Sequence, residues 1–420
     1  MERIIFRIDV NSAFLSWEAV YRLRHKGGKE DLRKIASAVG GDIALRHGII
    51  LAKSIPARHC GIRTGESVLE ARRKCPSLRL VPPHYTLYEE CSAALMDLLR
   101  EYSDVVEQYS IDEAFVDMSA TCHLFGSPKE AAERIRERIR EELGFTVNVG
   151  VSCNKLLAKM ASDFQKPDRV HTLYPGEIKA KMWPLPVSDL FFVGRASADK
   201  LLSMGICTIG ELAAADPLWL KRILKKQGEI IWGFANGFDL SVVLKQPAAN
   251  KGYGNSTTTP YDVTDEQTAG QVLLALAETV GSRLRADRVQ IGVISVTIRY
   301  ADLSDTSHQK CLPEPTDLTA QIHRIACSLF RELWDGRPIR HLGVHTGRVC
   351  GADCGRQLTV FDEIAYEKLS KIEQTVDGIR SRFGADAVMR AVFLNGPVDH
   401  MSGGISREKR SVDYDRETVR

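Results

Sequence analysis

Two strand-like segments that end in carboxylates constrain this chain more than any other feature of its sequence. The first, Ile4 to Val10, is an apolar run with Asp9 near its end, and a second strand pair, within Val105 to Val116, carries Asp112 and Glu113 at a turn. Any one of these residues alone would be interpreted as a solvated or turn-capping side chain. Together, at the ends of neighbouring apolar strands, they predict oxygen ligands for a pair of divalent metal ions, the arrangement that phosphoryl transfer uses.

The periodicity of the first 170 residues predicts an α+β fold. The order β, α, β, β, α, β, with an insertion after the first strand, matches the split βαβ arrangement of the ferredoxin-like class. The expected helices are Phe14 to Arg24, Leu87 to Leu99, Lys129 to Glu142 and Asn154 to Asp163, and the further expected strands are Ile35 to Val39, Ile49 to Ala52 and Phe145 to Val151.

The rest of the chain predicts a helical segment and a separate α+β domain. Leu190 to Leu212 is typical of a helix-hairpin-helix with a turn at Val193 and Gly194, although Phe192 stands where a second turn glycine is expected. Such a hairpin directs backbone N–H groups at a DNA phosphate, whereas the alternative is a helical corner that only packs. The later expected elements are helices at Glu266 to Arg285 and Leu318 to Trp334, strands at Val289 to Tyr300, Cys311 to Leu312 and Ile339 to Val349, and a tail helix with Leu369, Ile372, Val376 and Ile379 at heptad spacing.

Length and composition set the wider limits. At 420 residues we expect two to four domains. The net charge is only +3, but residues 12–81 hold fourteen Lys and Arg against six Asp and Glu, a local excess of +8 that suits phosphate. No signal-like or membrane-spanning apolar run is present, and the ten cysteines are scattered, so we expect a protein of the reducing cytoplasm with no membrane contact.

Four motifs resemble those of the Y-family of translesion DNA polymerases, in particular the bacterial polymerase IV branch. They are DVNSAFLSWE, PARHCGIRTGE, SIDEAFVD and GVSCNKLLAKMASDFQKPD, and the likeness extends to the HLGV segment. The resemblance implies a right-hand polymerase with a ferredoxin-like palm (1–11 and 82–172), small fingers (12–81) and a helix-hairpin-helix thumb (173–240). It further implies a linker (241–251), an α+β little finger (252–349) and a tail (350–420).

The resemblance also implies which residues act in the site. Asp9, Asp112 and Glu113 would be catalytic and, with the Val10 carbonyl, would bind two Mg²⁺ ions, with Mn²⁺ able to replace them. The other implied roles are the steric gate and sugar contact at Phe14, triphosphate contacts at Arg58 and Lys166, a supporting role for Lys159, which shares its helix with Lys155, and DNA contacts at Val193, Gly194 and Lys200.

Three residues depart from the family pattern. Ile55 replaces a tyrosine that would bond the triphosphate, so weaker or altered nucleotide binding is expected. Asn11 replaces a second aspartate that is not a metal ligand, so catalysis should survive. Ala13 replaces a larger residue beside Phe14, which loosens the packing of the gate.

The tail carries a short motif typical of peptides that bind the bacterial sliding clamp. Gln357 would fix the register while Leu358 and Phe361 fill an apolar cleft, and the alternative is a buried edge strand. His341, His345, Cys350 and Cys354 have zinc-like spacing, but the spacing fits no common finger and we predict no zinc site.

The implied function is primer extension with dNTPs on a DNA template by a monomer of low fidelity that bypasses damaged bases and has no proofreading domain. Two alternatives stay open at this point. A non-catalytic accessory factor of the same fold would bind clamp and DNA, but the three carboxylates argue against it. A nucleotide cyclase shares the palm, but it would not need a hairpin and a further domain that suit duplex DNA.

Overall fold

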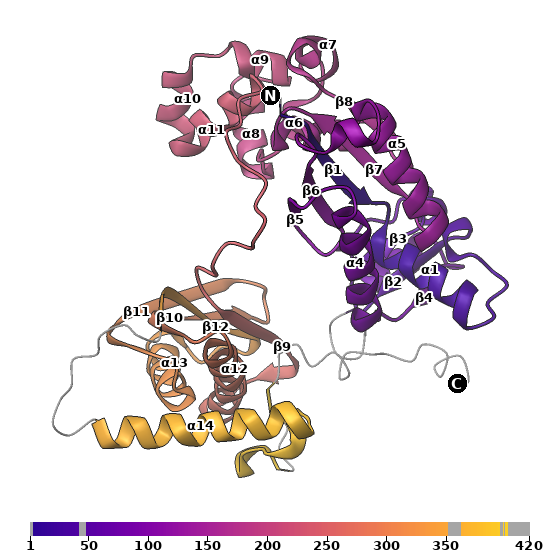
Figure 1. The fold of residues 1–420 in the computed structure, drawn as a ribbon. Coiled ribbons are helices and arrows are strands. Elements are labelled where there is room, and N and C mark those ends of the chain that lie inside the picture. The colour runs from indigo at the N-terminus through magenta and orange to yellow at the C-terminus, as the bar shows by residue number, and fades with distance from the viewer. Residues whose placement is uncertain (1–2, 42–47, 352–362, 395–397, 399, 402–420) are drawn as a thin grey trace. The chain divides into compact units, whose positions relative to one another are not determined.

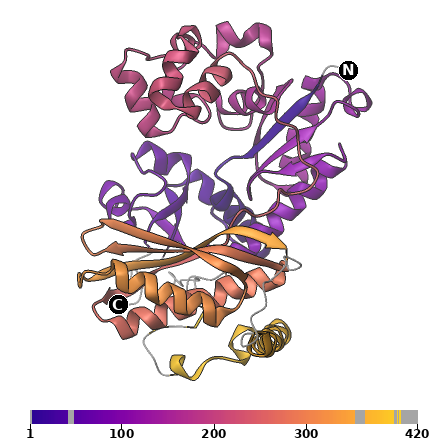
Figure 2. The same ribbon diagram turned by 90° about the vertical axis from the view of Figure 1, so that its left-hand side faces the viewer.

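The computed structural model describes residues 3–41, 48–351, 363–394, 398, 400 and 401. The chain forms two compact units (Figures 1 and 2). The first consists mainly of Met1–Gly40 and Ile50–Ala248, and the second mainly of Ala249–Val412. The division falls inside the predicted linker 241–251, while the finer domain boundaries stay predictions. In the part of the chain that is described, no helix is long and apolar enough to cross a bilayer.

The first unit is built on a five-stranded sheet in the order β5-β6-β1-β7-β8. The central strand β1 pairs antiparallel with β6 and β7, and β7 pairs parallel with β8. This mixed α+β arrangement is the predicted one. The strands are β1 (Ile5–Val10), β5 (Val106–Gln108), β6 (Glu113–Asp117), β7 (Val147–Ser152) and β8 (Val170–Thr172).

The two faces of this sheet differ in what covers them. Phe6, Ile8 and Val10 of β1 belong to a core formed with α4 (Tyr85–Arg100) and α5 (Pro128–Arg138). Successive residues of a strand point to opposite faces, so Arg7 and Asp9 point to the other face. That face packs on α6 (Lys155–Asp163), which places the predicted site beneath this helix.

A small subdomain follows β1. It holds a three-stranded sheet in the order β3-β2-β4, and Leu15 and Ala19 of the first helix join its core. The elements are α1 (Ala13–His25), β2 (Ser37–Gly40), β3 (Ile50–Lys53), α2 (Ile55–His59), α3 (Val68–Lys74) and β4 (Arg79–Val81).

Short helices complete the first unit. Their core is continuous with the outer side of α6, since Leu157 and Met160 belong to it. The elements are α7 (Ile178–Lys181), α8 (Arg195–Ser203), α9 (Ile209–Ala214), α10 (Pro217–Leu224) and α11 (Lys226–Ala235), with one-turn 3₁₀ helices at Pro175–Glu177 and Val187–Asp189.

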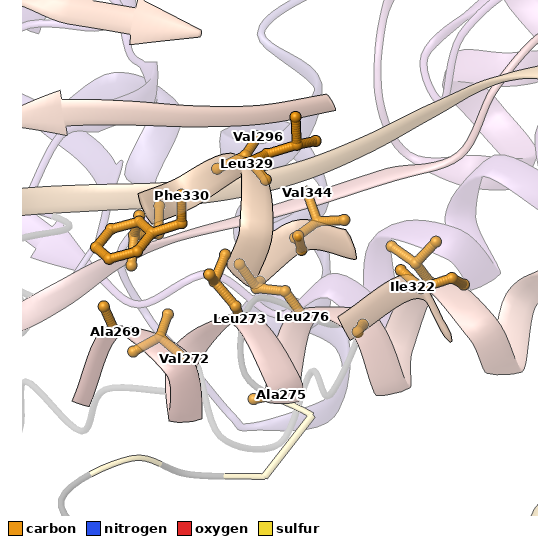
Figure 3. Packing of buried hydrophobic residues seen from close by; sticks show 14 of the residues in the cluster. Ala269, Val272, Leu273, Ala275, Leu276, Val296, Ile322, Leu329, Phe330 and Val344 are labelled. Atoms are coloured by element: carbon orange, nitrogen blue, oxygen red, sulfur yellow. The ribbon is translucent and has the colours of Figure 1, made fainter. Parts of the chain in front are cut away.

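The second unit is a four-stranded antiparallel sheet in the order β11-β10-β12-β9 with two helices packed against it. Figure 3 shows the core between these layers, where Leu273 and Leu276 of one helix meet Val296 and Val344 of the sheet. The elements are β9 (Gly254–Val263), α12 (Glu266–Ala286), β10 (Val289–Tyr300), β11 (Asp305–Thr316), α13 (Thr319–Leu333) and β12 (Ile339–Gly351).

One expected strand of this unit was wrong in extent. The sequence predicted Cys311 to Leu312 only, whereas β11 runs over twelve residues, Asp305–Thr316. Most of its side chains are exposed, so it lacks the apolar alternation that marks a half-buried strand. Its backbone pairing with β10 holds it in place. After β12 the chain continues to the tail helix α14 (Glu363–Phe383).

Candidate active site

Strand register brings two of the predicted carboxylates together. Asp9 lies directly opposite Glu113 in the β1–β6 pair, and the Val10 N–H donates to the carbonyl oxygen of Asp112 over 3.1 Å. Residues opposite each other in a sheet have Cβ atoms roughly 4.5–5.5 Å apart. The strands alone therefore place all three carboxylate-bearing residues at one end of the sheet.

Two lysines neutralise this acidic cluster. Lys166 Nζ lies 2.8 Å from Asp9 Oδ2, and Lys159 Nζ lies 3.4 Å from Glu113 Oε1 and 3.8 Å from Asp9 Oδ2. Both ammonium groups also contact Asp163 at 2.9 Å. Burial raises the pKa of the Asp9 carboxyl above its ordinary value, although the charge of Lys166 opposes the rise. Burial by itself would lower the pKa of Lys166, but the charge of Asp9 outweighs it and raises that pKa.

Arg7 is a site residue that sequence reasoning missed. Its side chain is fully buried, forms an ion pair with Glu113, and lies over the rings of Tyr109 and Phe115 at 5.1 and 4.6 Å from their centroids. Burial would raise the pKa of Glu113, but Arg7 first and Lys159 second hold it below its ordinary value. The signal was present in the sequence, because a cation inside the apolar run IIFRIDV needs a buried partner.

Asp112 is held by its own turn. The Ser110 hydroxyl donates to Asp112 Oδ1 over 2.6 Å and lies 3.3 Å from Glu113 Oε2. Among the described residues, no three acidic, His or Cys side chains converge as a ready-made cage for a metal ion. The donor set nevertheless fits a hard divalent cation, since carboxylate oxygens and a backbone carbonyl are its preferred ligands. A cation bound there would compete with Lys159 and Lys166 for Asp9 and Glu113.

A cavity of about 300 Å³ lies between the sheet and the inserted subdomain. Its lining residues include Val10 and Asp112 from the sheet end, Phe14 from α1, and Ile55 and Arg58 from α2. Ile55 and Arg58 are exposed toward solvent. The cavity therefore brings Asp112 and Val10 together with Phe14 and Arg58. Asp9, Glu113 and Lys166 do not line it, and Lys166 is paired with Asp9 instead.

Phe14 has the position expected of a steric gate and also packs as a core residue. It lines the cavity, yet its ring also stacks on Tyr88 with a centroid distance of 4.4 Å and lies 6.0 Å from Trp17. These contacts would make a gate rigid. Ala13 next to it, the first residue of α1, is buried in the same core.

Asn11 has a structural role that the sequence did not reveal. Its Oδ1 accepts the Thr146 hydroxyl at 3.0 Å and the Asp168 N–H at 2.9 Å, and its Nδ2 donates to Asn148. One side chain thus ties the end of β1 to β7 and to the loop that carries Lys166.

The predicted DNA-binding hairpin is centred on a tight turn before α8. Gly194 is the N-cap of this helix, and Phe192 adopts φ 74°, a left-handed conformation that glycine accepts at least cost. This is the position where a turn glycine was expected. The first helical turn of the hairpin, Val187–Asp189, lies one turn earlier than predicted. Lys200 is exposed on α8.

Two sets of predicted tail residues lie wholly or partly outside the described residues. They are the clamp residues Gln357, Leu358 and Phe361, and Cys354 of the His and Cys pattern. His341 Nδ1 is 3.0 Å from the Thr258 hydroxyl. The Cys350 thiol donates to the Gln290 carbonyl at 3.7 Å.

Comparison with known proteins places the chain in a family. Residues 8–163 match the model of the impB/mucB/samB family, residues 250–360 match the C-terminal domain of that family, and residues 175–206 match its HHH motif. The fold is similar to that of a Y-family DNA polymerase chimera, with a TM-score of 0.71 and 24 % identity over 83 % of this chain and 99 % of that one.

Several curated relatives are similar over almost their full length. DNA polymerase IV of Clostridium acetobutylicum is 44 % identical over 94 % of this chain and 99 % of its own. DNA polymerase IV of Acetivibrio thermocellus is 37 % identical over 94 % and 98 %, and DNA polymerase IV 1 of Bacillus subtilis is 36 % identical over 93 % of both. The chain therefore belongs to the impB/mucB/samB family, together with the DNA polymerase IV proteins.

Proposed function

We propose that Asp9, Asp112 and Glu113 are the catalytic carboxylates of this chain and hold two Mg²⁺ ions. The chain is a translesion DNA polymerase that takes primer–template DNA and dNTPs and depends on divalent metal, as its family membership implies. No comparison favours the non-catalytic alternative. The observation that supports the residue roles is the end of the sheet, where register sets Asp9 against Glu113 and Asp112 opens onto the cavity.

In this proposal a site lysine exchanges its carboxylate partner for a phosphate when metal and nucleotide bind. When bound, the two metal ions would activate the primer 3′-oxygen and stabilise the leaving pyrophosphate. Lys166 would then leave Asp9 and contact a phosphate oxygen, which keeps the charge of the site balanced. Its side chain is about one-third exposed, so the movement needs no repacking of the core. Mn²⁺ also accepts oxygen ligands and should replace Mg²⁺.

The cavity is the proposed nucleotide site. Arg58 at its rim offers a forked guanidinium to the triphosphate, and Phe14 packs against the sugar. Ile55 cannot donate a hydrogen bond to the triphosphate, so we infer that Arg58 and Lys166 carry a larger share of the phosphate binding.

Substitution of Asp112 tests the metal assignment. Asp112→Asn should abolish nucleotide incorporation and leave primer–template affinity within twofold of wild type, because the amide keeps the size of the side chain and loses its charge. Asp104→Asn removes an exposed carboxylate paired with Lys245 and serves as the control. Extension by Asp112→Asn at the wild-type rate in Mg²⁺ would remove the assignment.

We also propose that the polymerase is a cytoplasmic monomer whose hairpin at Val193, Gly194 and Lys200 contacts the duplex and whose tail binds the sliding clamp. Replacing both Leu358 and Phe361 by Ala should abolish stimulation of primer extension by the clamp and leave clamp-free extension unchanged. An equal loss in the two assays would indicate a structural strand instead of a clamp motif.

A further inference from the structure

The tail helix α14 contacts the second unit through its charged side. Glu373 and Asp377 lie one turn apart and both bind Arg285 of α12, with Nη1–Oε2 and Nε–Oδ2 distances of 2.5 and 2.6 Å. Arg285 and Glu373 are almost fully buried, and Glu373 also accepts the Thr319 N–H at 3.0 Å. The helix is therefore held by an ionic contact where an amphipathic helix normally buries apolar side chains.

Polar side chains also hold the two ends of the same helix against the unit. Near its start, the Tyr366 hydroxyl donates to Asp317 over 2.8 Å. Near its end, Arg380 contacts the buried Glu278 of α12 at 3.4 Å, and Arg390 beyond the helix contacts the same carboxylate at 2.8 Å. The polar side faces the unit over four turns.

In the part of the chain that the structure describes, the apolar side of α14 is partly exposed. Its large apolar residues alternate at spacings of three and four, which is the a/d pattern of a helix that packs on another helix. Leu369 is 40 %, Ile372 50 % and Phe383 74 % exposed, whereas Val376 and Ile379 are half-buried. No residue of this helix is among the described residues that form or pack against the core of the unit. We call this set the α14 seam: Leu369, Ile372, Val376, Ile379 and Phe383.

We propose that the α14 seam is a docking surface for an amphipathic helix of another protein, one whose apolar seam is flanked by acidic residues. Apolar residues that stay exposed or half-buried at such spacing mark interaction sites. Charge identifies the partner. With Leu369 at an a position and Ile372 at a d position, the e positions are Glu373 and Arg380, which already face the unit. The opposite flank, at the g positions, exposes Lys368, Thr375 and Arg382. Only acidic side chains complement that free flank.

A second copy of this chain fits the seam poorly. Two antiparallel α14 helices would bring Lys368 of each copy toward Arg382 of the other, and like charges at flanking positions are unfavourable. In a parallel pair the residues at the e positions of one helix would have to face the other helix, but these residues already contact the second unit. The chain's own residues 402–420 are also unsuited, because they hold five Lys and Arg against four Asp and Glu and begin with Gly403 and Gly404.

Peptide binding to the full chain tests the proposal. The probe is a fluorescein-labelled synthetic three-heptad peptide with Leu at a and d and Glu at e and g, and the matched probe carries Lys at e and g. We expect fluorescence anisotropy to report at least tenfold tighter binding of the acidic peptide. Ile372→Glu should remove this binding, and the double variant Lys368→Glu, Arg382→Glu should reverse the preference. Leu303→Glu, at a residue that is 63 % exposed elsewhere in the same unit, should change nothing.

Four outcomes would overturn the proposal. Equal affinity for both peptides would show an unspecific apolar surface, and binding of neither would show that the seam docks no helix of this kind. A dimer in sedimentation velocity that Ile372→Glu dissociates would assign the seam to a second copy. Peptide binding that is gained only after truncation behind Met401 would assign it to the chain's own tail. Since the substituted residues are exposed, circular dichroism should confirm that each variant is folded.

Discussion

Gly150 lies in β7 at the point where α6 crosses the sheet, and Gly150→Ala is a quantitative test of this packing. An added Cβ would lie 1.9 Å from the Ala158 carbonyl oxygen and 2.6 Å from the Ser162 nitrogen. Since Cβ contacts under 3.0 Å are essentially never seen, the helix must withdraw by at least 3.0 − 1.9 = 1.1 Å. Overpacking costs about 1–3 kcal/mol. Both obstacles are backbone atoms that cannot rotate away, so we expect a loss of about 3 kcal/mol in unfolding free energy.

The same withdrawal should lower activity, because α6 carries Lys159 to the carboxylates. Urea unfolding and single-nucleotide incorporation measure the two effects. Gly233→Ala in α11 is the control: its added Cβ has no neighbour within 4 Å, so the higher helix propensity of Ala should stabilise by up to about 1 kcal/mol. If Gly150→Ala proved as stable as wild type, the close approach of α6 to β7 would be refuted.

Four further predictions concern the site and its setting. Phe14→Ala should raise the ratio of ribonucleotide to deoxyribonucleotide incorporation on the order of ten- to two-hundredfold, the equivalent of about 1–3 kcal/mol of relieved overpacking; an unchanged ratio in a folded variant would make Phe14 a core residue only. Asn11→Ala should raise the KM for dNTP more than it lowers kcat, because the loop of Lys166 loses its anchor; steady-state kinetics that show an unchanged KM would contradict this. The N-cap Ser127 N–H and the Thr208 N–H hold the pKa values of Glu130 and Glu211 below the ordinary 4.5. The stability that these two carboxylates contribute is thus present above about pH 4.5 and lost as the pH falls further. In thermal unfolding at pH 3–6, the variants Glu130→Gln and Glu211→Gln should therefore show a weaker pH dependence than wild type. Primer–template affinity should fall steeply with salt and vary little with sequence in titrations at several salt concentrations, and a preference for one sequence would count against a phosphate-directed grip.

The carboxylates could be predicted because their signal is local. Asp9, Asp112 and Glu113 stand at or next to strand ends within apolar runs, and the antiparallel register sets Asp9 opposite Glu113, with Asp112 adjacent in the chain. The cations that balance them come from elsewhere in the chain, and nothing in the spacing of Lys159 or Lys166 distinguishes a site lysine from a solvated one. Only the tertiary fold brings these groups within 4 Å of Asp9.

Other features were hidden because their cause is tertiary. The heptad spacing of α14 was visible, but the side that faces the unit is decided by the buried Arg285, which lies almost ninety residues earlier in the chain. β11 carries mostly exposed side chains and gave only a two-residue signal for a twelve-residue strand. Backbone pairing and charge contacts leave little trace in hydrophobic periodicity.

The three cations of the site differ in how readily they can exchange a carboxylate for a phosphate of the substrate. Lys159 and Lys166 reach the carboxylates on flexible stems, with side chains 14 % and 34 % exposed, so they can exchange a carboxylate for a phosphate. Arg7 is fully buried against the rings of Tyr109 and Phe115 and has no other acidic partner to exchange for Glu113 among the described residues. Its planar guanidinium should therefore orient Glu113 both with and without nucleotide. Lysine at this position would keep the charge but lose the contact of the planar guanidinium with the two rings, so Arg7→Lys is not a conservative change here.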